Sequence, residues 1–149
     1  MSLKEQLSED LKDAMRQGDE TRKTALRLTI AAIKNAEVAA MKQFEDPDVI
    51  GIIAKQAKQR RESIDEFQKA NRQDLVDKEA AELKVLETYL PAQMSREDVV
   101  AEARKVIEEV DAKGPSDRGR VMAALMPRLA GRADGKLVNE AVTELLANL

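Results

Sequence analysis

The residues best suited to chemistry are glycines and basic side chains that alternate near the C-terminus. Glycines beside a helix start leave backbone N–H groups open to an anion, and arginine or lysine can add charge-assisted contacts to a phosphate backbone. These features predict a nucleic-acid-facing turn at seven positions: Gly119, Arg120, Gly131, Arg132, Asp134, Gly135 and Lys136. A helix C-cap followed by a tight turn requires the same glycines, and spacing alone favours that structural interpretation.

A second basic group lies on two expected helices in the N-terminal half: Arg27, Lys34, Lys55, Lys58, Arg60 and Arg61. Arginine binds phosphate oxygens in a bidentate manner and lysine adds point charge, so these residues could form a weaker phosphate-binding face. Acidic residues follow within about one helical turn, however, and such spacing usually gives solvated ion pairs, which is the favoured interpretation. Arg27 differs because it stands between Leu26 and Leu28, which predicts partial burial beside a carboxylate.

Cysteine and histidine are both absent from the 149 residues. Their absence removes disulfides, thiolate metal sites, the commonest general base and the commonest metal ligand. Acidic pairs such as Glu79 with Glu82 lack a convergent third ligand, and exposed helix surface is the simpler interpretation. We assign no catalytic, cofactor-binding or metal-binding residue from the sequence.

The N-terminal residues lack a continuous apolar segment, and no run of about 18 apolar residues occurs, so the sequence predicts neither a signal peptide nor a membrane span. The lack of cysteine is typical of intracellular proteins, and a cytoplasmic location is expected. Lysine and arginine number 25 against 28 aspartates and glutamates. With a net charge of -3, any attraction to nucleic acid must be local.

Good helix formers dominate the chain and strict two-residue alternation is not sustained, which predicts an all-α fold of seven helices. The expected helix starts are Ser2, Asp19, Asp46 with Pro47, Ser95 and Ser116, and the expected ends include Gly18, Phe44, Leu90 and Gly114. Pro91 cannot extend the fourth helix. It predicts a boundary between residues 1–91, a bundle of long helices, and residues 92–149, a small three-helix domain.

Three segments together resemble the YqeY family and the related C-terminal domain of GatB, the subunit of the tRNA-dependent amidotransferase that presents misacylated tRNA. They are residues 24–35 (TALRLTIAAIKN), 53–90 (with KQRRESIDEF and NRQDLVDKEAAEL) and 119–146 (with GRVMAALM and GRADGKLVNEAV). The resemblance implies a bundle of long helices followed by a three-helix tail. By similarity to GatB, it also implies that the seven C-terminal positions face tRNA.

The function implied by this resemblance is a non-catalytic adaptor that binds tRNA, or a tRNA-amidotransferase or synthetase assembly. The large catalytic cradle of GatB has no counterpart in this chain, so a glutamine-dependent carbon–nitrogen ligase label describes the relatives. An alternative from another class is a protein interaction module whose helix faces bind a partner helix or a second copy. The sequence leaves the oligomeric state open.

Overall fold

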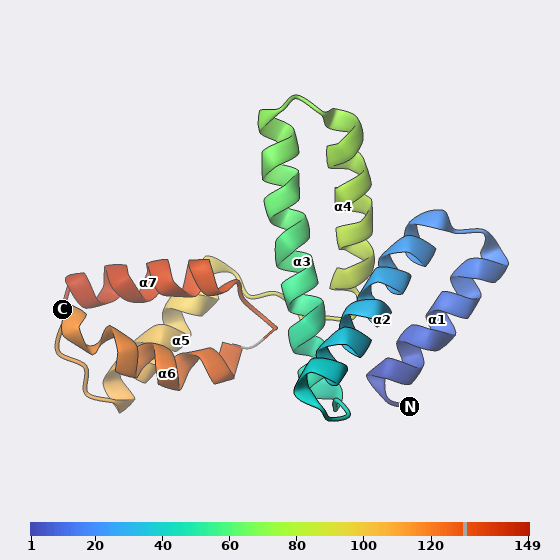
Figure 1. Cartoon of the computed structure of the whole chain (residues 1–149). Coiled ribbons are helices and arrows are strands. Elements are labelled where there is room, and N and C mark those ends of the chain that lie inside the picture. The colour runs from blue at the N-terminus through green and yellow to red at the C-terminus, as the bar shows by residue number, and fades with distance from the viewer. Residues whose placement is uncertain (130) are drawn as a thin grey trace. The chain divides into compact units, whose positions relative to one another are not determined.

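Helices dominate the computed structural model, which describes residues 1–129 and 131–149 (Figure 1). The α-helices of this described part are α1 (Leu3–Gln17), α2 (Glu20–Ala40), α3 (Asp46–Lys69), α4 (Gln73–Glu87), α5 (Arg96–Glu109), α6 (Arg118–Leu129) and α7 (Gly135–Ala147). A short 3₁₀ turn, η1 (Pro115–Asp117), leads directly into α6. The described residues contain no β-strand, and the all-α prediction is confirmed.

The helices group into two compact units, each with its own hydrophobic core. The first unit, residues 1–90, contains α1 to α4, and the second unit, residues 91–149, contains α5 to α7. A chain of this composition can support a small core in each unit because apolar residues recur at helical spacing in every helix. The division of the chain into domains of residues 1–91 and 92–149 stays a prediction.

The ends of α1 follow the expected local chemistry. The Ser2 hydroxyl accepts a hydrogen bond from the Glu5 N–H at 3.2 Å, and the Glu5 carboxylate accepts from the Ser2 N–H at 3.4 Å. This reciprocal pair is a capping box, and it satisfies N–H groups that have no partner inside the helix. At the other end Gly18 has φ +68°, and Asp19 then caps α2 by accepting from the Arg22 N–H. These predictions are confirmed.

Helix α2 ends earlier than the predicted Phe44, because Met41 adopts a left-handed conformation with φ +56°. The loop that follows is held by Glu37, whose carboxylate accepts from Lys4 Nζ and from the Phe44 N–H, both at 2.7 Å. The Lys4 hydrogen bond, followed by that of Phe44, lowers the pKa of Glu37 below its usual range. These contacts connect the start of α1 with the end of α2.

Asp46 is the first residue of α3 and not the cap predicted from the sequence, a position that Glu45 occupies instead. The Asp46 carboxylate accepts from the Leu3 N–H at 2.9 Å, so it caps the first turn of α1 across 43 residues of sequence. Pro47 lies in the first turn of α3, where its missing N–H leaves no helical hydrogen bond unmade. One acidic side chain thus joins two helix starts.

The core of the first unit draws on all four of its helices. Its buried members are Leu7, Ala14, Leu26, Ile33, Val49, Ile53 and Leu86. Helices α3 and α4 form the long antiparallel hairpin that Figure 1 shows in green, and α2 packs against α4 beside it. Burial of these apolar side chains is the main stabilising contribution to the unit.

Tyr89 fastens the end of α4 to α1, because its hydroxyl donates to Asp10 Oδ2 at 2.5 Å. Burial, followed by the hydrogen bond to the Asp10 carboxylate, raises the pKa of Tyr89 well above its ordinary value of 10.0.

This shift predicts that the free energy of unfolding falls as pH rises above 10, since the unfolded chain releases the Tyr89 proton at the ordinary pKa while the folded chain retains it. The chain has one tyrosine and no tryptophan, so the ultraviolet absorbance of tyrosinate measures this titration directly. Replacing Tyr89 with Phe should remove the alkaline decline that the tyrosine causes. A folded protein whose tyrosine titrates near 10 would contradict the prediction.

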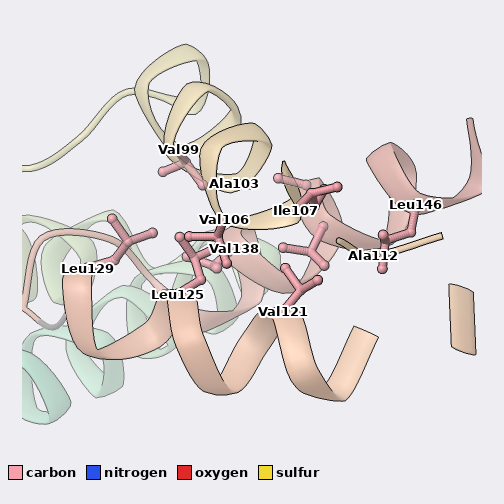
Figure 2. Packing of buried hydrophobic residues seen from close by; sticks show 12 residues of the cluster. Val99, Ala103, Val106, Ile107, Ala112, Val121, Leu125, Leu129, Val138 and Leu146 are labelled. Carbon is pink, nitrogen blue, oxygen red and sulfur yellow. The ribbon is translucent and has the colours of Figure 1, made fainter. Parts of the chain in front are cut away.

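The second unit closes around apolar side chains from three helices, and Figure 2 shows them converging between the ribbons. Its buried members are Val99, Ala103, Val106, Ile107, Ala112, Val121, Leu125, Leu129, Val138, Ala141, Val142 and Leu146. Ser95 caps α5 as predicted, by accepting from the Asp98 N–H at 3.1 Å. Ser116 is part of the η1 turn, and α6 begins two residues after it and continues through Pro127.

Candidate nucleic-acid interface

The structure separates the two glycine–basic groups predicted from the sequence. Gly119 and Arg120 lie in the first turn of α6, whereas residues 131–136 join the other end of α6 to α7. With 12 residues in α6 and a rise of about 1.5 Å per residue, about 18 Å separates the two groups. The seven positions therefore do not form one continuous turn.

Arg120 is held by neighbouring groups of its own unit. Its Nη1 donates to the Val110 carbonyl at 2.9 Å, and its Nη2 lies 3.1 Å from Asp117 Oδ1. Val110 is the C-cap of α5, so the guanidinium satisfies a carbonyl that has no partner inside that helix. A hydrogen bond from the Lys113 N–H, and then one from Arg120, lowers the pKa of Asp117. The structural role is sufficient to explain Arg120.

The backbone of the α6–α7 turn is also fixed by internal hydrogen bonds. Gly131 has φ +74°, a left-handed conformation that favours glycine, and the Arg132 N–H donates to the Leu129 carbonyl at 2.9 Å. The Arg132 carbonyl accepts from the Met94 N–H at 2.8 Å, and Gln93 Nε2 donates to the Gly131 carbonyl at 2.9 Å. The turn is therefore tied to the segment that precedes α5.

The start of α7 already has an internal acceptor for its N–H groups. Asp134 is the N-cap, and its Oδ1 accepts from the Lys136 N–H at 3.2 Å. This carboxylate occupies the place where a bound anion would meet the helix N-terminus. Gly135 has an open side, since an added Cβ would meet only Met126 Cε at 3.8 Å. What the turn offers a ligand is the two exposed side chains of Arg132 and Lys136.

The weaker basic face of the first unit is divided by the structure. Arg60 is only 7% exposed and forms ion pairs with Glu79 at 3.0 Å and with Glu82. Its Nε is buried without a hydrogen-bond partner among the described residues. The prediction that Glu79 and Glu82 lie on exposed helix surface is wrong, because Glu82 is 3% exposed. Arg60 thus belongs to the interior of the α3–α4 hairpin.

The other basic positions remain at the surface. Lys34, Lys55 and Lys58 are exposed, and Arg61 lies 3.8 Å from Glu87. The predicted partial burial of Arg27 beside a carboxylate is wrong: the side chain is exposed, with Nη2 4.0 Å from Met15 Sδ. Leu26, which precedes it, is the neighbour that enters the core.

The described residues contain neither a metal-binding cluster nor a membrane-spanning helix. No group of three or more acidic side chains converges in a way that could hold a metal ion. None of the helices there combines the length and the apolar character needed to cross a bilayer.

Comparison with known proteins identifies relatives over most of the chain. The family model described as Yqey-like protein matches residues 4–146. A Kluyveromyces lactis protein named Altered inheritance of mitochondria protein 41, mitochondrial, is 41% identical over 114 residues, which cover 74% of this chain and 61% of the relative. The protein of that name from Pyrenophora tritici-repentis is 34% identical over 146 residues, 94% of this chain and 78% of the relative. The chain thus spans about three fifths of the length of the K. lactis relative.

The relatives correct the expected location. They are named as mitochondrial proteins, which points to mitochondria, so the prediction of a cytoplasmic location is wrong. The residues behind that prediction could not distinguish the two compartments. The family model matches residues 4–146, and the P. tritici-repentis relative is 34% identical over 94% of the chain. Together these matches show that this protein belongs to the YqeY-like family.

Proposed function

We propose that this protein is a non-catalytic adaptor whose second unit binds the phosphate backbone of tRNA through Arg132 and Lys136. The observation that carries the proposal is that these two side chains are exposed and form no salt bridge within the described part of the chain. They project from a turn whose backbone is fixed by internal hydrogen bonds, so little backbone conformational entropy would be lost when they bind.

The surrounding charges contrast with these two residues. Several other basic side chains of the second unit are already paired with carboxylates, including Arg96 with Glu144, Arg128 with Glu109 and Lys113 with Asp111. A phosphate would have to compete with a carboxylate for each of those cations. At Arg132 and Lys136 it would not. Arg104 is also exposed and forms no salt bridge within the described part of the chain, but only the turn offers two such cations four positions apart. The resemblance of residues 119–146 to the tRNA-binding tail of GatB supports the same ligand.

Binding is expected to be weak and sensitive to salt. The second unit has 9 lysines and arginines against 10 aspartates and glutamates, counted over residues 91–149, so its net charge is 9 − 10 = −1. Two phosphate contacts give a slope of about −1.8 for the logarithm of affinity against the logarithm of salt concentration. We expect a dissociation constant in the micromolar range or weaker.

Replacing Arg132 and Lys136 together with alanine should remove most of this salt dependence and weaken binding at least about tenfold at low salt, because both phosphate contacts are lost. Fluorescence anisotropy of labelled total tRNA with the full chain, at low and physiological salt, measures both quantities.

The matched control is Lys105→Ala with Lys113→Ala, which removes two exposed cations that are paired with Glu102 and Asp111. This control should bind tRNA nearly as well as the unaltered chain. An equal loss in both double variants would show that general charge, and not the turn, attracts tRNA. Absence of binding at either salt concentration would reject tRNA as the ligand.

A further inference from the structure

We infer that the outward face of helix α2 binds an acidic amphipathic helix of a partner protein. This α2 outer face consists of six exposed residues: Arg27, Leu28, Lys34, Val38, Met41 and Lys42. Lys34, Val38, Met41 and Lys42 follow three- and four-residue spacings at the end of the helix, and Arg27 lies seven residues before Lys34, which places these five on one side. Leu28 lies at the edge of that side. The opposite side of α2 holds the buried residues Ala25 and Thr29. This surface belongs to the first unit and does not depend on the tRNA proposal.

The apolar part of the α2 outer face is unusually exposed. Met41 is 92% exposed, Val38 is 78% exposed and Leu28 is 53% exposed. Single exposed apolar residues are ordinary in soluble proteins, but Val38 and Met41 lie three residues apart on one stripe at the end of α2, with Leu28 at its edge. A stripe of that kind, rimmed by charge, is typical of a surface that a second helix covers.

The backbone conformation of Met41 indicates that this surface has a functional role. It has φ +56° at the C-cap of α2, while Gly18 fills the equivalent position of α1 with φ +68°. Glycine is the favoured residue there, because a Cβ is strained in the left-handed conformation. The Met41 side chain makes no buried contact that would offset this strain. Local choices that weaken a fold without a packing gain are expected at functional sites.

Two hollows lie beside the C-terminal end of α2. One, of about 550 Å³, is lined by Val38, Met41 and Lys42, and the other, of about 370 Å³, has Leu7, Ile30 and Ile33 in its lining. Lys34, Glu37 and Gln43 line both, so the hollows form one groove along the end of α2. A groove with an apolar floor and a flexible methionine at its edge suits the apolar face of a helix.

The charges around the groove indicate that the partner helix is acidic. Arg27, Lys34 and Lys42 form no salt bridge within the described part of the chain. Other basic residues of α2 are paired, since Arg22 lies 3.1 Å from Asp13 and Lys23 lies 3.2 Å from Glu20. The three remaining cations favour glutamate or aspartate beside the partner's apolar stripe.

The same charges argue against other occupants. A second copy would bring its own Arg27, Lys34 and Lys42 against those of the first, and like charges oppose that contact. A nucleic acid would leave Val38 and Met41 facing phosphates. The neighbouring Phe44 ring, on which a base could stack, already has Lys42 Nζ 5.8 Å from its centroid. An anionic membrane would also satisfy the charges, and vesicles are therefore one arm of the test.

The test uses the full chain and three probes of known chemistry. The first is a synthetic helical peptide with leucines along one face and glutamates on either side of them. The second is the same peptide with lysines in place of the glutamates, and the third is a set of phosphatidylglycerol–phosphatidylcholine vesicles. Calorimetric titration of the peptides should give micromolar binding of the acidic one, with the lysine version at least about tenfold weaker. Vesicles should not co-sediment with the protein.

Variants distinguish specific binding in the groove from non-specific binding of the peptide. Met41→Gly should raise the melting temperature by about 2 to 5 °C and yet weaken the acidic peptide about tenfold, because strain and an apolar contact are removed together. Val38→Ser should weaken the peptide by a similar factor. Lys34→Glu should reduce binding at least tenfold, whereas Lys69→Glu, near the end of α3, should leave it unchanged.

Several results would overturn the inference: equal binding of both peptides, unchanged binding by Met41→Gly, or binding of vesicles without the acidic peptide. The double variant of Arg132 and Lys136 should bind the acidic peptide as the unaltered chain does. That comparison keeps the failure of this inference distinct from the failure of tRNA binding.

Discussion

Replacing Glu82 with alanine is expected to lower the free energy of unfolding by about 3 kcal/mol. Glu82 and Arg60 face each other inside the α3–α4 hairpin, with side chains that are 4% and 9% exposed. Removal of the carboxylate leaves the Arg60 guanidinium buried with only Glu79, at 3.0 Å, to compensate it. An uncompensated buried charge is far more destabilising than a lost surface contact. Chemical denaturation followed by far-ultraviolet circular dichroism measures the loss.

The control for this prediction is Glu66→Ala on the same hairpin. Glu66 lies 3.9 Å from Lys69, and both side chains are at least 75% exposed, so its removal should change stability by less than about 0.5 kcal/mol. If Glu82→Ala were equally mild, the buried ion pair would have no special role in the hairpin.

A double replacement tests the cause of the loss. Arg60→Met with Glu82→Leu removes both charges and keeps apolar volume in the hairpin, so it should recover most of the stability that Glu82→Ala loses. A double variant as unstable as the single one would show that the hydrogen bonds themselves hold the hairpin together. The same double variant should bind tRNA normally, since Arg60 is buried and the proposed contacts lie in the other unit.

Features that the sequence predicted well depend on neighbouring residues. The capping box of Ser2 and Glu5, the left-handed Gly18 and the caps at Asp19 and Ser95 all rest on side chains within three or four positions of the backbone groups that they satisfy. Such local hydrogen bonds are encoded by residue type and spacing alone. The all-α class follows from helical periodicity for the same reason.

Features that the sequence missed depend on contacts between helices. Asp46 looked like the cap of its own helix, but its carboxylate reaches the Leu3 N–H 43 positions away. Arg60 and Glu82 are 22 positions apart, and only the register of α3 against α4 brings them together. One signal was present: Arg60 occupies a position in the stripe of α3 that apolar residues otherwise fill. A charge in such a stripe indicates a buried partner on the facing helix.

For the candidate nucleic-acid interface too, local features were predicted correctly and contacts between helices were missed. The glycine turn at residues 131–136 was placed correctly at a helix junction, because Gly131 and Asp134 act locally. Arg120 was grouped with it by residue type, and its contacts with Val110 and Asp117 across the α5–α6 connection could not be seen from spacing. The α2 outer face escaped notice for a different reason. The sequence suggested that α2 continued to Phe44, and only the left-handed backbone at Met41 shows that this methionine is both strained and exposed.

Replacing Leu125 with alanine should destabilise the second unit by about 3 kcal/mol and leave the first unit folded. Leu125 is fully buried at the centre of the α5–α7 core, so its loss leaves a cavity among side chains that cannot fully close it. A unit of this size has little stability to spare, and its thermal transition should move well below that of the first unit.

The single tyrosine makes this prediction decisive for the boundary near Pro91. Tyr89 belongs to the first unit and the chain has no tryptophan, so tyrosine fluorescence reports the first unit while circular dichroism reports the helices of both. With Leu125→Ala, the dichroism should show an early transition that the fluorescence does not follow. Leu26→Ala, in the core of the first unit, should shift the fluorescence transition instead. If both probes move together in both variants, residues 1–91 and 92–149 fold as one cooperative unit, because loss of either core then unfolds the whole chain.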